Sequence, residues 1–108
     1  MKVTSVERIW VDLPLKPVPF RNMVREIPHW SLFEICKVTL SNGVVGVGET
    51  MPYYTWGEVT DEAVARVHDR HAATVMWDDT LGAGLQMALF DAVAKSMDAP
   101  VWLSLIHI

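Results

Sequence analysis

The sequence has few basic residues, one cysteine and no long apolar run. Its 108 residues include nine Lys and Arg against thirteen Asp and Glu, for a net charge of −4. Scattered cations in an acidic chain argue against nucleic acid or an anionic membrane as a partner. No window approaches the ~18 apolar residues of a membrane span, and no signal-peptide core is present. We therefore expect no membrane contact and a cytoplasmic location.

The single cysteine, Cys36, excludes an internal disulfide. It lies in a strand-like run and is expected to be a small buried hydrophobe. Hydrophobic residues make up 51% of the chain and charged residues 20%, which is typical of a globular rather than a disordered protein. The length allows at most one domain with a modest core.

The first half of the chain predicts three strands in an antiparallel meander. Val3–Asp12, Leu32–Leu40 and Val44–Thr50 are rich in β-branched and alternating apolar residues. Ser41-Asn42-Gly43 between the last two is the signal of a tight hairpin. Repeated prolines in Leu13–Trp30 exclude a regular helix or a central strand, so we expect a long loop there.

The second half predicts helices, which makes the fold class α+β. Thr60 is a plausible N-cap for a helix over Val59–Val67, and Ala72–Met76 fits a short second helix. The sequence GAGLQMALFDAVAKSMDAPV, Gly82–Val101, reads as a longer helix that ends before Pro100. It is apolar on almost every side, so it should be buried on every side. A domain of this size has too little structure to cover both faces, so we expect a missing partner domain.

The last six residues, Leu103–Ile108, are what the bases CTGTCTCTTATACACATC encode, which is the end of a transposon used to prepare sequencing libraries. We interpret 103–108 as a non-native, adapter-derived tail and 1–102 as the native domain. The alternative is a natural hydrophobic C-terminal strand.

No motif in the sequence forms a complete active site, and we assign no catalytic or metal-binding residue. Gly46-Val47-Gly48 and Gly82-Ala83-Gly84 lack the pattern of a nucleotide-binding loop, so packing contacts are expected. The spacing of Glu26, His29 and Glu49 matches no metal motif.

Two predicted loops, one after the first strand and one after the third, have the composition of a recognition surface. The first and third strands run the same way in a meander, so the loops that follow them should emerge at one end of the sheet. Guanidinium donors and aromatic faces suit a polar, hydroxylated, anionic ligand. The alternative is that the aromatic residues belong to the core. The candidate substrate-binding residues are Arg21, Arg25, His29, Tyr53, Tyr54 and Trp56.

The order of these features resembles the N-terminal capping domain of the mandelate racemase/muconate lactonizing enzyme group of the enolase superfamily. The resemblance covers about residues 2–102. The residues that carry it are Gly43, Gly46, Gly48 and Glu49 in the hairpin and Ala88, Phe90, Asp91, Lys95 and Pro100 in the last helix segment.

The resemblance implies a parent enzyme whose TIM-like barrel is absent from this chain. Such enzymes abstract the proton α to a carboxylate, with Mg²⁺ held by barrel carboxylates and a barrel lysine or histidine as base. The parent would be a homo-oligomeric racemase, dehydratase or cycloisomerase acting on a small carboxylate such as an acid sugar. This piece would bind no cofactor and be inactive alone. Its loops, Leu15–Ser31 and Thr50–Gly57, would cap the barrel. The alternative is a free-standing α+β binding or dimerisation module.

Overall fold

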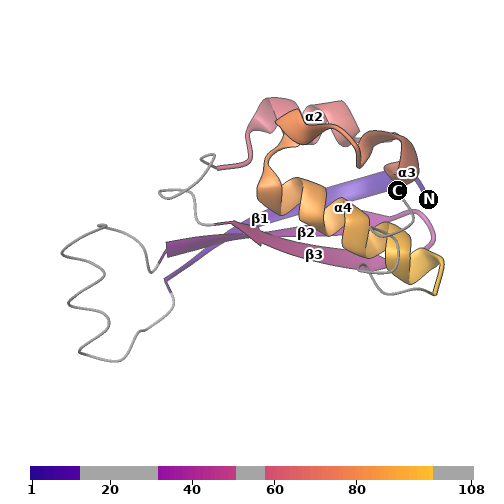
Figure 1. Ribbon diagram of the computed structural model, residues 1–108, viewed down its shortest axis with the longest axis horizontal. Helices are drawn as coiled ribbons and strands as arrows, with labels where there is room; N and C mark the ends of the chain where they lie inside the picture. Colours follow the sequence, from indigo (N-terminus) through magenta and orange to yellow (C-terminus); the bar gives the residue numbers. More distant parts are fainter. Residues whose placement is uncertain (13–31, 51–57, 99–108) are drawn as a thin grey trace.

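The computed structural model describes residues 1–12, 32–50 and 58–98. Within them the chain is α+β, as predicted: a three-stranded antiparallel sheet is followed by helices (Figure 1). The elements in chain order are β1 (Val3–Asp12), β2 (Leu32–Leu40), β3 (Val45–Thr50), α2 (Asp61–Val67), α3 (Ala72–Val75), the 3₁₀ helix η1 (Asp79–Leu81) and α4 (Ala83–Ser96).

The sheet has the order β1-β2-β3, so the predicted meander is confirmed. β2 lies in the centre and pairs antiparallel with both neighbours. Gly43 has a φ of 85°, which favours glycine, and closes the β2–β3 hairpin. The Val44 N–H donates to the Asn42 side-chain oxygen at 3.1 Å. The asparagine-glycine pair therefore builds the turn that the sequence predicted.

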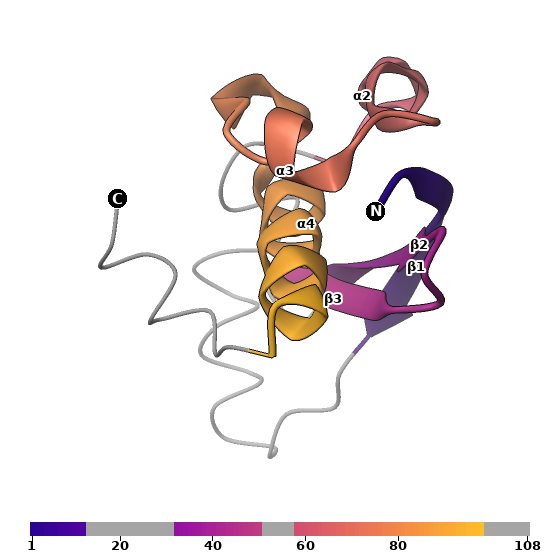
Figure 2. The same ribbon diagram turned by 90° about the vertical axis from the view of Figure 1, so that its right-hand side faces the viewer.

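Helix α4 packs on one face of the sheet, directly over β3 and β2 (Figure 2). Two strand glycines allow this close approach. A Cβ added at Gly46 would lie 2.2 Å from the Ala88 carbonyl oxygen, and one at Gly48 would lie 2.1 Å from the Gly84 carbonyl oxygen. Any side chain would therefore push the helix backbone away. The expectation that this glycine pair serves packing is confirmed.

The core lies between this face of the sheet and the helices. Its members are the apolar side chains at alternate positions of β2, one side of α4 and parts of α2 and α3. The largest fully buried apolar side chains are Leu40, Leu81, Leu85, Leu89, Val3, Val38, Val59 and Val67.

The predicted long helix is shorter than the pattern indicated. It spans Ala83–Ser96, after Gly82 with a φ of 100°. The side of α4 that faces the sheet is buried, whereas Met87 remains 46% exposed. Phe90 is half-buried, and its ring meets the Trp77 ring edge-on at 5.2 Å. The expectation that this helix is buried on every side is therefore confirmed only for the side that faces the sheet.

Asp91 and Lys95, four residues apart on α4, form an ion pair at 3.0 Å. They also close the outer edge of β3, which the sequence did not indicate. The Val47 N–H donates to Asp91 Oδ2 at 2.9 Å, and Lys95 Nζ donates to the Val45 carbonyl at 3.0 Å. These side chains take the place of a neighbouring strand, so this part of the edge is protected from further pairing.

The predicted N-cap of α2 is confirmed: the Ala63 N–H donates to Thr60 Oγ1 at 3.1 Å. At the start of β1, the Val3 N–H donates to the Arg70 carbonyl, and Lys2 forms a bridge with His71. The helical half is thereby tied to the sheet. None of the helices in the described ranges has the length and apolar character needed to cross a membrane.

Candidate functional site

β1 and β3 end at the same end of the sheet, which we call the loop end. Asp12 is paired with Leu32, and Thr50 is paired with Glu34, so both strands finish beside the beginning of β2. Figure 1 shows these strand ends together at the left of the view. The expectation that the chain leaves β1 and β3 at one end of the sheet is confirmed.

The six candidate substrate-binding residues follow these two strand ends in the sequence. All six lie outside the described residues, so their role stays a prediction: Arg21, Arg25, His29, Tyr53, Tyr54 and Trp56.

The loop end contains a buried carboxylate that sequence reasoning missed. Glu34 is only 1% exposed, and its Oε1 accepts a hydrogen bond from the Val59 N–H at 2.8 Å. The alternation of β2 places Glu34 on the same face as Cys36 and Val38. A glutamate in phase with buried residues was the signal available in the sequence. Burying a carboxylate is costly without such a partner. The presence of a glutamate at this buried position therefore needs a structural or functional reason.

Arg8, on β1, binds the carbonyl group of Val59, whose N–H is bound by Glu34. Its Nη1 donates to the Val59 carbonyl at 2.9 Å, and its Nη2 is bonded to Asp61 Oδ1. The hydrogen bond to Asp61 raises the pKa of the guanidinium. Val59 thus has both backbone groups bound by side chains from the sheet, Glu34 on β2 and Arg8 on β1.

Cys36 lies two residues after Glu34, on the same face of β2, and is fully buried, as predicted. Burial raises the pKa of its thiol to about 12, and the negative charge of Glu34 adds to the shift. The thiol is therefore protonated near neutral pH, and a protonated, buried thiol is a poor nucleophile. This geometry gives Cys36 a packing role.

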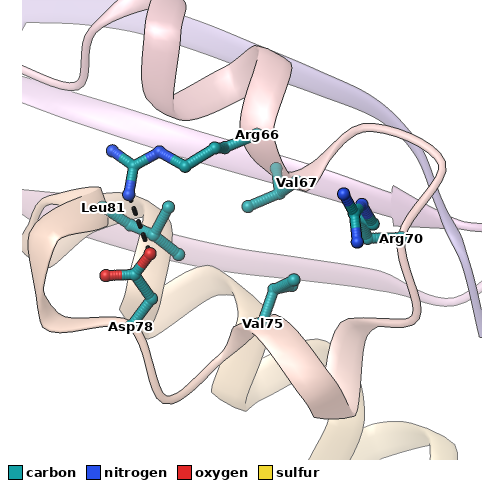
Figure 3. A pocket seen from close by; sticks show the side chains of 6 residues that line it. All are labelled: Arg66, Val67, Arg70, Val75, Asp78 and Leu81. Atoms are coloured by element: carbon teal, nitrogen blue, oxygen red, sulfur yellow. Dashed lines mark hydrogen bonds and ion pairs between the residues drawn. The ribbon is translucent and has the colours of Figure 1, made fainter.

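A cavity of about 220 Å³ lies between α2, α3 and η1, away from the loop end (Figure 3). Its apolar floor includes Val67 and Leu81. Arg66 at the rim donates to Asp78 at 2.8 Å and to Thr80 at 2.7 Å, so its charge is already engaged. The backbone of Arg70, on the other side, bonds to Val3 at the beginning of β1. These contacts tie the helical half together rather than form a ligand site.

Across residues 1–12, 32–50 and 58–98, no group of three or more His, Cys, Asp or Glu is arranged to hold a metal ion. We therefore assign no metal ligand to this part of the chain.

Comparison with known proteins gives one informative result. A scan against family models and a search of curated proteins find no match. Among solved structures, the chain is similar to the muconate lactonizing enzyme from Pseudomonas putida, with a TM-score of 0.57 and 22% identity. The two share a fold. The match covers 90% of this chain but only 30% of that enzyme, so the chain spans about a third of the length of its structural relative.

Proposed function

We propose that this chain is the N-terminal capping domain of an enolase-superfamily enzyme of the mandelate racemase/muconate lactonizing enzyme group. The observation that carries the proposal is the structural match, which takes in nearly all of this chain and 30% of muconate lactonizing enzyme. A shared fold is an argument by analogy. Within this fold, β1 and β3 end together, which places the two proposed capping segments at one end of the sheet.

The parent enzyme would racemise, dehydrate or cycloisomerise a small carboxylate by removing its α-proton. A bound Mg²⁺ would stabilise the charge that develops on the carboxylate. By the family resemblance, we place the metal ligands and the base in the barrel. The 108-residue chain alone would then be inactive. We further propose that the parent is a cytoplasmic homo-oligomer and that 103–108 is the adapter-derived tail.

The role of this domain would be to shape substrate specificity and exclude water from the barrel mouth. Arg21, Arg25 and His29 would supply donors to an anionic substrate, and Tyr53, Tyr54 and Trp56 would supply stacking surface. These segments follow β1 and β3, so they would approach a substrate from one rigid support. Binding residues are commonly found on loops that a rigid scaffold positions.

Exposed apolar side chains support the missing barrel. Met87, Met97 and Trp77 are 46%, 59% and 47% exposed, and all three lie on or beside α4. A contiguous apolar patch is typical of an interaction site, and we propose that the barrel covers these side chains. The alternative is a free-standing binding or dimerisation module. Such a module would not dimerise by adding a strand at this part of β3, because Asp91 and Lys95 already occupy the edge.

The experiment that tests the proposal has two steps. First, the source gene is read beyond the codon for Trp102; a continuing frame that encodes a barrel supports the proposal, and a stop codon after Ile108 favours the free-standing module. Second, the purified 108-residue chain is incubated with Mg²⁺ and mandelate or an acid sugar in deuterated water. We expect no α-proton exchange. Exchange that a chelator abolishes would show that the chain carries its own base and metal site.

A further inference from the structure

Val59 is held by the sheet on both sides of its peptide backbone. Glu34 Oε1 accepts from its N–H at 2.8 Å, and Arg8 Nη1 donates to its carbonyl at 2.9 Å. Val59 itself is 1% exposed and belongs to the core cluster. Water cannot easily replace the Glu34 contact, because donor and acceptor are both buried.

Glu34 also lies beside the last residue of β3. Thr50 is its partner in the β2–β3 register and is 6% exposed. Directly opposed residues of antiparallel strands have Cβ atoms about 5 Å apart. One side chain on the central strand therefore contacts the place where the chain returns, at Val59, and lies next to the place where it leaves, at Thr50.

A carboxylate is an expensive choice for this position. On the same face of β2, the next positions are filled by Cys36, Val38 and Leu40, all buried apolar residues. An apolar residue at position 34 would continue this core but would leave the Val59 N–H without an acceptor. The hydrogen bond, rather than core packing, is what Glu34 adds.

We propose that Glu34 is a positioning residue that fixes Val59 beside the end of β3, with Arg8 as its second contact. The chain that leaves the sheet at Thr50 is thereby made to return at one defined place. Resting on the proposed function, this makes Glu34 a determinant of substrate specificity in the parent enzyme, although it does not itself touch substrate.

The first test uses the 108-residue chain and backbone amide hydrogen exchange. The readout is the exchange rate of the Val59 N–H relative to that of Leu89, which lies in α4 and reports global opening. Glu34→Met removes the acceptor at similar volume and should raise this ratio about tenfold or more, the fold-change of a lost hydrogen bond of about 1.4 kcal/mol. Glu34→Gln keeps an oxygen acceptor at the same reach and should raise it less than about threefold.

Glu7→Gln is the matched control, because Glu7 is exposed and its side chain lies on the opposite face of the sheet. It should leave the ratio unchanged. If Glu34→Met does not fold, Glu34→Asp keeps the charge but shortens the reach, and it should raise the ratio more than Glu34→Gln does. An unchanged ratio in Glu34→Met, or equal loss of protection in the Gln and Asp variants, would overturn the positioning role.

The second test uses the complete enzyme encoded by the source gene. Glu34→Met should lower kcat/KM for the preferred carboxylate about tenfold while α-proton exchange persists, and Glu34→Gln should restore most of it. Normal kinetics in Glu34→Met, together with faster Val59 exchange, would overturn the link to specificity but not the hydrogen-bonded support. A gene without a barrel would overturn the proposed function while leaving the exchange test intact.

Discussion

The two ends of the sheet are built from different chemistry. At the end where β1 begins, Val3 and Leu40 face each other and are buried, and the backbone of Val3 bonds to that of Asp69 and Arg70. At the loop end, Glu34 and Thr50 are buried polar residues. The first end is closed by apolar packing, whereas the second has polar groups at the points where the chain leaves and rejoins the sheet.

This difference supports our proposal that the loop end, rather than the opposite end, sets specificity in the parent enzyme. Apolar packing accounts for stability, but buried polar groups lower stability unless each one is satisfied. Proteins commonly place recognition on loops held by a rigid scaffold. The loop end has that construction, because Glu34 and Arg8 hold the backbone of Val59 against the sheet.

The largest expected effect comes from the helix contact that both ends share. Gly46→Ala and Gly48→Ala would each place a Cβ within 2.5 Å of α4 backbone atoms. Each should lower the free energy of unfolding by about 3 kcal/mol or more, measured by urea denaturation. Val47→Ala between them is the control, because Val47 is 47% exposed, and it should cost less than about 1 kcal/mol. If only one of the two alanine variants loses stability, α4 does not contribute equally to the stability of the two ends of the sheet.

A smaller difference in the free energy of unfolding should distinguish the two ends of the sheet. Leu40→Ala, at the apolar end, should cost about 2–5 kcal/mol because it leaves a cavity in the core. Glu34→Gln, at the loop end, should cost about 1 kcal/mol or less because the amide oxygen can still accept from Val59. Urea denaturation of both variants gives the comparison. Equal costs would make Glu34 a stability element and remove the contrast.

The smallest effect concerns a polar contact outside both ends. Hydrogen bonds from Thr80, and then Arg66, hold the pKa of Asp78 below its ordinary value of 3.8. The folded pKa is lower than the unfolded one, so this contribution to stability is present above about pH 4 and is lost as pH falls through the folded pKa. Between about pH 5 and pH 3, wild type should lose more stability than Asp78→Asn. Parallel pH profiles would show that this exposed cluster contributes nothing.

The strands and the main helix were predictable because their signals are local. β-Branched and aromatic residues marked β1, period-2 alternation marked β2, and Asn42-Gly43 marked the hairpin between β2 and β3. Helix α4 was recognised, but its ends were placed too far out, because apolar composition does not report where Gly82 turns the backbone.

The contacts of the loop end were not predictable, because they join residues far apart in sequence. Glu34 looked like one polar residue in an alternating strand until the fold brought Val59 to it. The protection of β3 by Asp91 and Lys95 likewise needs the helix to be placed over the strand. Pairing across the fold depends on tertiary geometry, which periodicity does not contain.

The measurement that tests the central claim most directly is the kinetics of the complete enzyme with single changes in the predicted capping segments. If these segments bind substrate while the barrel performs chemistry, Arg25→Ala and Tyr54→Ala should each lower kcat/KM about tenfold or more, with α-proton exchange retained. Unchanged kcat/KM in both variants, with a normal melting temperature, would contradict the claim that this domain sets specificity.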